Sequence, residues 1–537
     1  MTPRQAEIAA GGEATREPAP DASKAESRRD LASLASGWLL SLLGLVASGV
    51  FGFAFGIVIA RGLGAAGAGV FFTSVAVFTI GAVAAQFGAT TGLIRSIARF
   101  RALEELESIR PTLAAALVPL LVSGVVLGAT LFVFAHDIAT AILDGDAAAT
   151  AERYLRVFAP FLPLAVVTSA LLGATRGFGT MIPLVAIEHI GKGLLRTGLA
   201  LAVLGAGLGS VALALAWAVP HALGLLAAVA ALAIVMGRAA RPGRRAYVPT
   251  AGLTSEFWRF TAPRGVAGIL QMTLAWLDTI LVAALASPHE AGIYRAAISY
   301  INQGSFANQA IVFVVGPLLS GLLAQHLHER AQSVYHTATW WLSALSWPIY
   351  LSFAVFAPLF MSVFGSEFVA GATALVILSL PMLLAMAAGP VNVVLVMAGK
   401  SSWNLYNVAL ALVTNVVLNV VLIPPFGITG AAVAWAVTIV VLNVAALVEV
   451  GMFLKLRPLG SGFAIVAAIS LVCYGALGLL IRIALGTTVP AFILFLVVAT
   501  AVYVALLWRF REALHIGVLF ESLKTRRRGR IGEAEVA

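Results

Sequence analysis

Long apolar stretches separated by short polar segments dominate the sequence after its first few dozen residues. Apolar windows of about 20 residues, the length that crosses a bilayer, begin near Leu34, Gly67, Pro111, Tyr154, Met181 and Gly209. A basic break from Gly237 to Arg245 follows, and further windows begin near Phe257, Ala291, Thr337, Gly371, Ser402, Ile428, Ser461 and Val489. This pattern predicts an all-α polytopic membrane protein of about 14 transmembrane helices.

Composition supports the same class. The chain is 61% hydrophobic and 11% charged, which excludes a soluble globular protein of 537 residues. Residues 1–33 are polar and are expected to form a disordered cytoplasmic tail rather than a signal peptide, and 511–537 form a basic tail. The one cysteine, Cys473, lies in an apolar window, so no intrachain disulfide or Cys-based metal site is expected.

The distribution of basic residues predicts the orientation. With the N-terminus in the cytoplasm, the inside loops and tails hold most of the 34 Lys and Arg. The exceptions are Arg61, Arg153, Arg156, Lys192, Arg196, Arg295 and Arg482. Because Lys and Arg favour cytoplasmic loops, both termini are predicted to be cytoplasmic, in a bacterial plasma (inner) membrane. The net charge of +10 therefore implies no nucleic-acid partner.

Short matches between the two halves predict an internal repeat. Residues 68–71 resemble 291–294, and 215–219 resemble 433–437, in the same order and at similar spacing. An even number of spans per repeat gives both halves the same orientation. We expect two six-helix lobes, residues 34–250 and 251–456, related by a pseudo-two-fold along the membrane normal with the substrate site between them. Residues 457–510 would add two helices outside the repeat.

The window from Met181 to Gly207 carries four ionisable side chains. At 100° per residue, Glu188, His189, Lys192 and Arg196 share one helical face. Each charge at mid-membrane costs roughly 3 kcal/mol on insertion scales, so this face must meet a bundle interior or a wet cavity.

Two interpretations of this face remain open. A Glu188–Lys192 pair could be purely structural, but Lys192 and Arg196 outnumber the one acid and leave a positive excess. A functional cavity would then hold an anion, and His189 could add a third donor when protonated. Gly191 and Gly193 flank Lys192 and would let a bulky headgroup approach.

Asp278 is a lone acid in the seventh predicted span, towards the outer face. A buried carboxylate can bind H⁺ or Na⁺ and couple transport to an ion gradient. Asp278 could equally pair with Arg61 or Arg295 as a static gate. Arg61 could also simply extend to the membrane interface.

Uncharged polar residues within the spans offer contacts for sugar hydroxyls. The candidates are Gln86, Gln271, Asn302, Gln303 and Asn308, with Asn392, Asn415 and Asn419 as further polar positions. Taken singly, each is as well explained by hydrogen bonding between helices.

Three motifs resemble polysaccharide exporters of the multidrug/oligosaccharidyl-lipid/polysaccharide (MOP) superfamily. They are Ile59–Phe71, Trp276–Leu281 followed by Glu290–Tyr294, and Phe426–Ala434, within a resemblance extending from about Ser33 to Leu456. The resemblance implies a V-shaped flippase that moves an undecaprenyl-pyrophosphate-linked oligosaccharide to the outer leaflet by alternating access. It also implies a polysaccharide polymerase and glycosyltransferases as pathway partners. Residues 50–55 lack the arginines that the peptidoglycan-precursor branch carries in its first span.

Two other classes compete with this interpretation. A membrane glycan polymerase or ligase needs a large soluble loop or clustered catalytic groups. The longest predicted outer loop, about 136–152, offers Asp137, Asp144 and Asp146 without a basic partner cluster. No nucleotide-binding loop, His/Cys metal set or nucleophile elbow occurs, so neither an enzyme nor a cofactor is expected. An H⁺- or Na⁺-coupled drug/cation antiporter is the runner-up, and would favour carboxylates over a basic patch.

Overall fold

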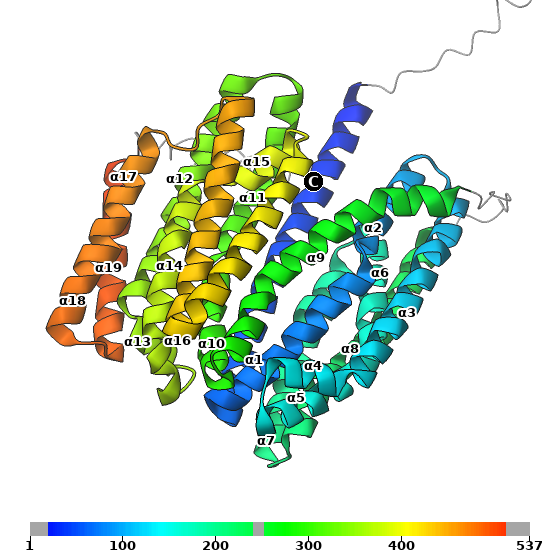
Figure 1. The fold of residues 1–537 in the computed structure, drawn as a ribbon. Helices are drawn as coiled ribbons and strands as arrows, with labels where there is room; N and C mark the ends of the chain where they lie inside the picture. The colour runs from blue at the N-terminus through cyan, green and yellow to red at the C-terminus, as the bar shows by residue number, and fades with distance from the viewer. Residues whose placement is uncertain (1–19, 240–251, 512–537) are drawn as a thin grey trace, which may run out of the picture.

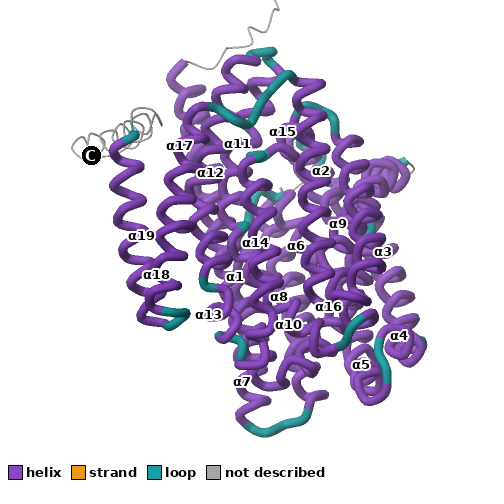
Figure 2. Tube along the Cα trace, turned by 60° about the vertical axis from the view of Figure 1, so that its left-hand side comes forward, coloured by secondary structure: helices purple, strands orange, loops and turns teal. Residues whose placement is uncertain are grey.

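The computed structural model describes residues 20–239 and 252–511, and these form helices without a single strand (Figures 1 and 2). The all-α prediction is confirmed. Residues 20–33, expected in the N-terminal tail, are helical, whereas residues 1–19, the break at 240–251 and the basic tail from 512 lie outside the described residues. We use "inner" for the end of the bundle that the charge bias predicts to be cytoplasmic.

Two helices are too long to cross a bilayer once, and each turns at a glycine. Helix α1 (Pro20–Gln86) contains Gly64 at φ 68°, and α16 (Ser401–Leu454) contains Gly427 at φ 55°. A straight helix of 54 residues would measure roughly 80 Å, more than twice the hydrocarbon thickness. Glycine adopts positive φ at little steric cost, so each helix becomes two arms joined at the predicted outer end.

The remaining helices of the N-terminal lobe follow the predicted spans closely. The region 136–152, expected to be an outer loop, is instead largely helical (α4 and α5). The elements are α2 (Ala89–Ala102), η2 (Leu106–Ser108), α3 (Ile109–Val133), α4 (Ala135–Ile142), α5 (Gly145–Phe158), η3 (Ala159–Phe161), α6 (Leu162–Gly177), η4 (Leu184–Gly191), α7 (Lys192–Gly205) and α8 (Ser210–Ala239).

The C-terminal lobe begins with a long helix that lies obliquely between the two lobes in Figure 1, and it ends with α16. Four further helical segments, α17, η6, α18 and α19, follow where the sequence predicts an additional pair of spans. The elements are α9 (Leu253–Leu285), α10 (Pro288–Gly304), α11 (Phe306–Ala324), α12 (His328–Val355), α13 (Ala357–Ser362), η5 (Ser366–Gly371), α14 (Ala372–Ala387), α15 (Val391–Met397), α17 (Ser461–Ser470), η6 (Leu471–Ala476), α18 (Leu477–Leu485) and α19 (Val489–Arg509).

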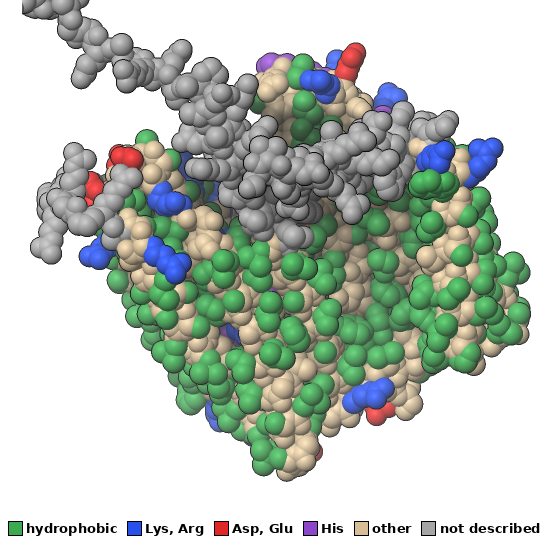
Figure 3. Space-filling model, turned by 180° about the vertical axis from the view of Figure 1, so that it is seen from behind, with side chains coloured by type: hydrophobic (Ala, Val, Ile, Leu, Met, Phe, Trp, Pro, Cys, Tyr) green, Lys and Arg blue, Asp and Glu red, His purple; other side chains and the backbone are tan. Residues whose placement is uncertain are grey.

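Nine helical segments of the described chain are long and apolar enough to cross a bilayer, or ten if the bent pair 288–312 and 315–324 forms one span. Two of the nine contain the glycine turns of α1 and α16. The η4–α7 segment and α12 occupy further predicted spans without belonging to this set. The exact count of fourteen therefore stays a prediction. Figure 3 shows a broad hydrophobic belt with Lys and Arg gathered mostly along its upper edge.

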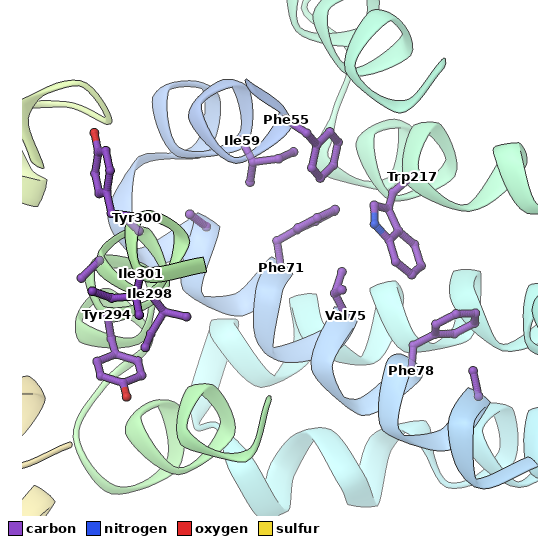
Figure 4. Packing of buried hydrophobic residues seen from close by; sticks show 14 of the residues in the cluster. Phe55, Ile59, Phe71, Val75, Phe78, Trp217, Tyr294, Ile298, Tyr300 and Ile301 are labelled. Carbon is purple, nitrogen blue, oxygen red and sulfur yellow. The ribbon is translucent and has the colours of Figure 1, made fainter. Parts of the chain in front are cut away.

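The second arm of α1 lies between the lobes and joins their cores. On one side, Phe71 points towards Phe55 and Trp217 (Figure 4), and Phe78 packs edge-on against Trp217 at 5.1 Å between ring centroids. On the other side the arm packs against α10 so closely that a methyl group on Gly292 would lie 2.0 Å from the carbonyl oxygen of Ala65.

Helix α9 likewise contacts both lobes, touching α2 and α3 as well as α10 and α16. Near its inner end the indole N–H of Trp258 donates to the carbonyl of Ala115 at 3.2 Å. A Cβ on Gly265 would lie 2.5 Å from the backbone of Phe87, so α9 meets the turn between α1 and α2 backbone to backbone there. The predicted lobe boundary near residue 250 therefore precedes a helix that is shared between the lobes.

The last helices, α17 to α19, pack beside α12 on the side of the C-terminal lobe that faces away from the N-terminal lobe (Figure 1). The phenol of Tyr503 donates to Ala344 O at 2.9 Å, and the Arg482 guanidinium donates to Val355 O at 2.7 Å. The bond to a helix-end carbonyl explains how Arg482 is accommodated near the predicted outer end.

Candidate transport site

The charged face predicted in the fifth span lies at the junction of a π-helix and an α-helix. Residues 184–191 form the π-helical segment η4, and Lys192 opens α7. Wide turns of this kind are rare in helices and are frequently found at functional sites.

Lys192 is buried, and its Nζ donates to Glu188 Oε1 at 2.7 Å. The structure therefore contains the Glu188–Lys192 pair that the sequence offered as the structural alternative. The second carboxylate oxygen of Glu188 is also buried and has no hydrogen-bond partner among the described residues. Such an unpaired acceptor in an apolar setting is unfavourable, so the pair is incompletely satisfied.

Arg196 is bound within the N-terminal lobe by α8. Its Nε donates to Trp217 O at 3.1 Å, its guanidinium lies 4.4 Å from the Trp217 ring centroid, and Nη2 lies 3.1 Å from His221 Nε2. His221 Nδ1 lies 3.0 Å from Ala218 O and must donate to that carbonyl. Nε2 is then free to accept from Arg196, so these bonds require the neutral imidazole. Glu188 holds Lys192, and Arg196 is held separately.

The space expected beside Lys192 is filled. A Cβ on Gly193 would lie 2.7 Å from Phe51 Cβ of the first arm of α1, so this glycine serves close helix packing. The expectation that Gly193 leaves room for a headgroup is wrong in this conformation. His189 also faces the first arm of α1, where a Cβ on Gly44 would lie 3.2 Å from its ring.

Asp278 is buried between α9, α10 and α16. The hydroxyl of Tyr294 donates to Oδ2 at 3.0 Å, and Asn419 Nδ2 donates to Oδ1 at 2.8 Å. Both side-chain polar atoms of Asn415 and the amide oxygen of Asn419 are buried without partners among the described residues. Asp278 is thus held by neutral donors, and its expected pairing with Arg61 or Arg295 is not the one observed.

Arg61 instead bridges the two lobes at the outer end. Its Nε donates to Val363 O at 3.0 Å, and the nearby backbone N–H of Ala65 donates to Glu367 Oε2 at 3.2 Å. We call these two bonds, together with the close contact of Gly69 and Gly292, the outer joint.

Arg295 lies on α10 between aromatic rings from both lobes. Its guanidinium carbon is 3.9 Å from the Trp276 ring centroid and 5.9 Å from that of Phe72. Its Nε is buried without a hydrogen-bond partner among the described residues. A cation held by ring faces keeps donors available for another group.

The sugar-contact candidates do not form one cluster. Gln303 Nε2 donates to Gly49 O at 3.1 Å, Gln86 accepts from Thr90, and Asn302 is exposed. Asn308 has a buried amide oxygen without a partner in the described chain.

Gln271 lines a cavity of about 780 Å³ in the C-terminal lobe. We call it the C-lobe cavity. It is formed by α9, α11, α15 and α16 and includes Ser320, Asn392 and Asn404, with a wall otherwise made of apolar side chains, glycine and proline.

Sequence reasoning missed the partners that hold the charged groups. Trp217 and His221 bind Arg196, and Tyr294 binds Asp278, but an aromatic residue in an apolar window carries no signal of such a role. Sequence reasoning also missed a buried hydrogen bond within α16, which Asn407 Nδ2 donates to Glu449 Oε2 at 2.7 Å. Glu449 was detectable as an acid within an apolar window.

A family model described as "Polysaccharide biosynthesis protein" matches residues 34–323, more than half of the chain. The chain belongs to this polysaccharide biosynthesis family. The resemblance drawn from the three sequence motifs is confirmed by this match.

Solved structures show that this family member has the fold of MOP superfamily transporters. The lipid II flippase MurJ in an inward closed conformation has a TM-score of 0.72 at 12% identity, covering 89% of this chain and 99% of MurJ. An inward-facing multidrug resistance MATE transporter has a TM-score of 0.61 at 16% identity, covering 76% and 94%. A MOP transporter from Pyrococcus furiosus, described by the reverse polarity of its binding pocket, has a TM-score of 0.55 at 16% identity, covering 82% and 95%.

Among curated proteins, this family member is similar to the probable low-salt glycan biosynthesis flippase Agl15 of Haloferax volcanii. The two are 29% identical over 175 residues, which is 31% of this chain and 36% of Agl15. The match thus spans about a third of the relative's length.

Proposed function

We propose that this protein is a flippase that moves an undecaprenyl-pyrophosphate-linked oligosaccharide from the inner to the outer leaflet by alternating access. The polysaccharide biosynthesis family and the likeness to Agl15 support a glycan substrate, and the likeness to MurJ supports a lipid-linked one. Polymerases and glycosyltransferases of the same pathway would act before and after this step.

The observation that carries the proposal is the buried cation Lys192 with its incompletely satisfied partner Glu188. A translocated pyrophosphate needs a basic partner inside the membrane, and Lys192 can supply one only by exchanging Glu188 for the substrate. Arg295, with its free Nε between the lobes, is a second group that would meet the headgroup. Arg196 and His189 would position the neighbouring side chains, and Lys192 and Arg295 would contact the pyrophosphate first.

Asp278 is proposed to couple transport to an ion. Its carboxylate lies beside buried amide oxygens of Asn415 and Asn419 that have no partner in the described chain. Oxygen ligands of this kind suit Na⁺, and a carboxyl group held by neutral donors also suits H⁺. Occupation by a cation would compensate the buried charge.

The outer joint is proposed as the outer gate. Arg61 and Glu367 contribute one bond each across the lobes, and both bonds must break for the outer side to open. Alternating access would open this joint while closing the inner side.

The test is complementation of a flippase-deficient strain, with export of lipid-linked glycan and protein level measured together. Wild type should restore export, while Lys192→Ala should reach the membrane and export less than about a tenth as much, and Lys192→Arg should keep part of the activity because charge survives. Because Lys192→Ala leaves Glu188 unpaired, the double variant Glu188→Gln/Lys192→Gln controls for stability. Arg153→Ala, an exposed outer cation, should export normally. Full export by Lys192→Ala would refute the anion site.

The second candidate is a cation antiporter, favoured by the two buried acids of the C-terminal lobe, Asp278 and Glu449. It predicts drug resistance in an exporter-deficient strain and no restoration of glycan export. The same complementation test therefore separates the two functions.

A further inference from the structure

Among the described residues, those that line the C-lobe cavity include no ionisable side chain. Its polar groups are the amides of Gln271, Asn392 and Asn404 and the hydroxyl of Ser320, spread over all four helices that form it. The amide oxygen of Asn392 is buried and has no hydrogen-bond partner among the described residues. A few uncharged polar groups on an apolar wall are typical of a small-molecule site. The amide oxygen of Asn392 can accept a hydrogen bond from a ligand, because no described protein group donates to it.

Buried acids lie beyond this lining in two directions. Asp278 follows the lining residue Leu274 by one helical turn of α9. Glu449 accepts a hydrogen bond from Asn407, which lies between the lining residues Asn404 and Val408. Neither acid has an ion-pair partner among the described residues: their bonds come from Tyr294, Asn419 and Asn407.

Two bases lie close to lining residues in the sequence, and each packs against an aromatic ring. Arg264 is exposed two turns before Gln271 and lies 3.7 Å from the Phe260 ring centroid. Lys400 is exposed one turn before Asn404, with Nζ 5.2 Å from the Phe453 centroid. Exposed charges are screened by water and salt, whereas buried groups such as these two acids are screened much less. Arg295 packs on Trp276, about 200° around α9 from Leu274.

We infer that the C-lobe cavity binds the glycan of the lipid-linked substrate and selects an uncharged sugar against an acidic one. This rests on the proposed function and adds the class of sugar to it. A neutral sugar offers hydroxyl and acetamido groups to the amides and its C–H faces to the apolar wall. A uronic acid would bring an anion into a cavity whose described lining offers no base and that is bounded by two carboxyl groups, which is unfavourable on both counts. In the bound substrate, the pyrophosphate would contact the N-terminal lobe at Lys192, and the glycan would lie in the C-lobe cavity.

Binding to the purified full-length protein tests the inference. The probes are three synthetic polyprenyl pyrophosphates of equal chain length, carrying N-acetylglucosamine, glucuronic acid or no sugar, and native mass spectrometry reports their dissociation constants. We expect the neutral sugar to bind at least about tenfold more tightly than the acidic one. Gln271→Lys should remove or reverse that preference, and Asn404→Lys is a second variant in the same lining. Gln325→Lys places the same charge at an exposed position outside the lining and should leave the ratio unchanged.

Each other outcome contradicts the inference in a recognisable way. Equal binding of the neutral and acidic probes by the wild type would overturn the selection. An unchanged ratio in both lysine variants would assign selection to another part of the molecule. If the sugar-free probe binds as tightly as the neutral one and Gln271→Lys weakens both equally, the cavity holds the polyprenyl chain. Failure of all three probes to bind would instead refute the proposed flippase, and the sugar assignment with it.

Discussion

At the scale of single residues, three ionisable groups of the candidate site each have a partner that is specific to their position. Lys192 has Glu188 one turn away, Arg196 has the ring and carbonyl of Trp217, and Asp278 has Tyr294 and Asn419. Only the first of these is an ion pair. The two others use neutral donors, acceptors or ring faces, which stabilise a charge without cancelling it.

Releasing Lys192 from its acid should strengthen anion binding. Glu188→Gln removes the charge that competes with a pyrophosphate, and a hydrogen bond to a charged group contributes about 1.5–3 kcal/mol. We expect undecaprenyl pyrophosphate to bind roughly tenfold more tightly to this variant and to be exported more slowly, because release becomes harder. Dissociation constants and export rates would be measured on the same preparations. Weaker binding in Glu188→Gln would show that the acid helps to hold the substrate.

Neutralising Asp278 should separate binding from ion coupling. Asp278→Asn keeps the size of the side chain and removes its charge, so substrate binding should persist while transport in proteoliposomes no longer responds to an imposed H⁺ or Na⁺ gradient. Asp146→Asn, at an exposed outer position, is the matched control and should respond as wild type does. Gradient-driven transport that persists in Asp278→Asn would make this carboxyl purely structural.

At the scale of helices, the two glycine turns are each stabilised by a carboxylate from another element. Ile428 N–H donates to Glu290 Oε2 at 2.7 Å just after Gly427, and Ala65 N–H donates to Glu367 just after Gly64. The first N–H groups of a helix have no partner within it. A carboxylate accepts a hydrogen bond from such a group and also interacts favourably with the positive end of the helix dipole. Because Glu367 belongs to the opposite lobe from Ala65, one such contact lies across the outer joint.

Adding a single methyl group to the outer joint should open it. In Gly292→Ala the new Cβ would lie 2.0 Å from the carbonyl oxygen of Ala65, so the second arm of α1 and α10 must separate. Spin labels at Leu63→Cys and Ser362→Cys, in a Cys473→Ala background, should report a longer distance than in the parent.

The control is Gly268→Ala, where the added methyl meets no atom within 4 Å. Its spin-label distance should match that of the parent. An unchanged distance in Gly292→Ala would mean that the packing adjusts locally and that the joint does not respond to this contact.

At the scale of the whole molecule, the distribution of Lys and Arg makes the orientation testable. Reporters fused after Arg245 and Lys455 should be cytoplasmic, and reporters inserted between Asp144 and Ala149 should be external. A combined phosphatase and fluorescent-protein assay distinguishes the two sides. A periplasmic signal after Arg245 would contradict both the orientation and the six-plus-six arrangement of spans.

The apolar pattern of the sequence was sufficient to predict the helical class and the approximate start of most helices, because bilayer thickness sets the length of each window. It could not reveal the π-helix at residues 184–191, which looks like any apolar segment. Helical periodicity placed Glu188 and Lys192 together, but the Asp278 partner Asn419 lies 141 residues away. Contacts between distant helices depend on tertiary packing, which a single sequence does not specify. For the same reason the glycine beside Lys192 was misinterpreted as an open approach.

The shared position of α9 has a consequence for biogenesis. A ribosome adds about 5–20 residues per second, so Asp278 is synthesised on the order of ten seconds before Asn419, which follows it by 141 residues. Tyr294, only 16 residues later, is the first partner to arrive. Until α16 is made, α9 can contact only the N-terminal lobe and the first C-terminal helices, and Asp278 lacks its hydrogen bond from Asn419. The native environment of α9 is therefore complete only after α16 has been synthesised, more than a hundred residues later.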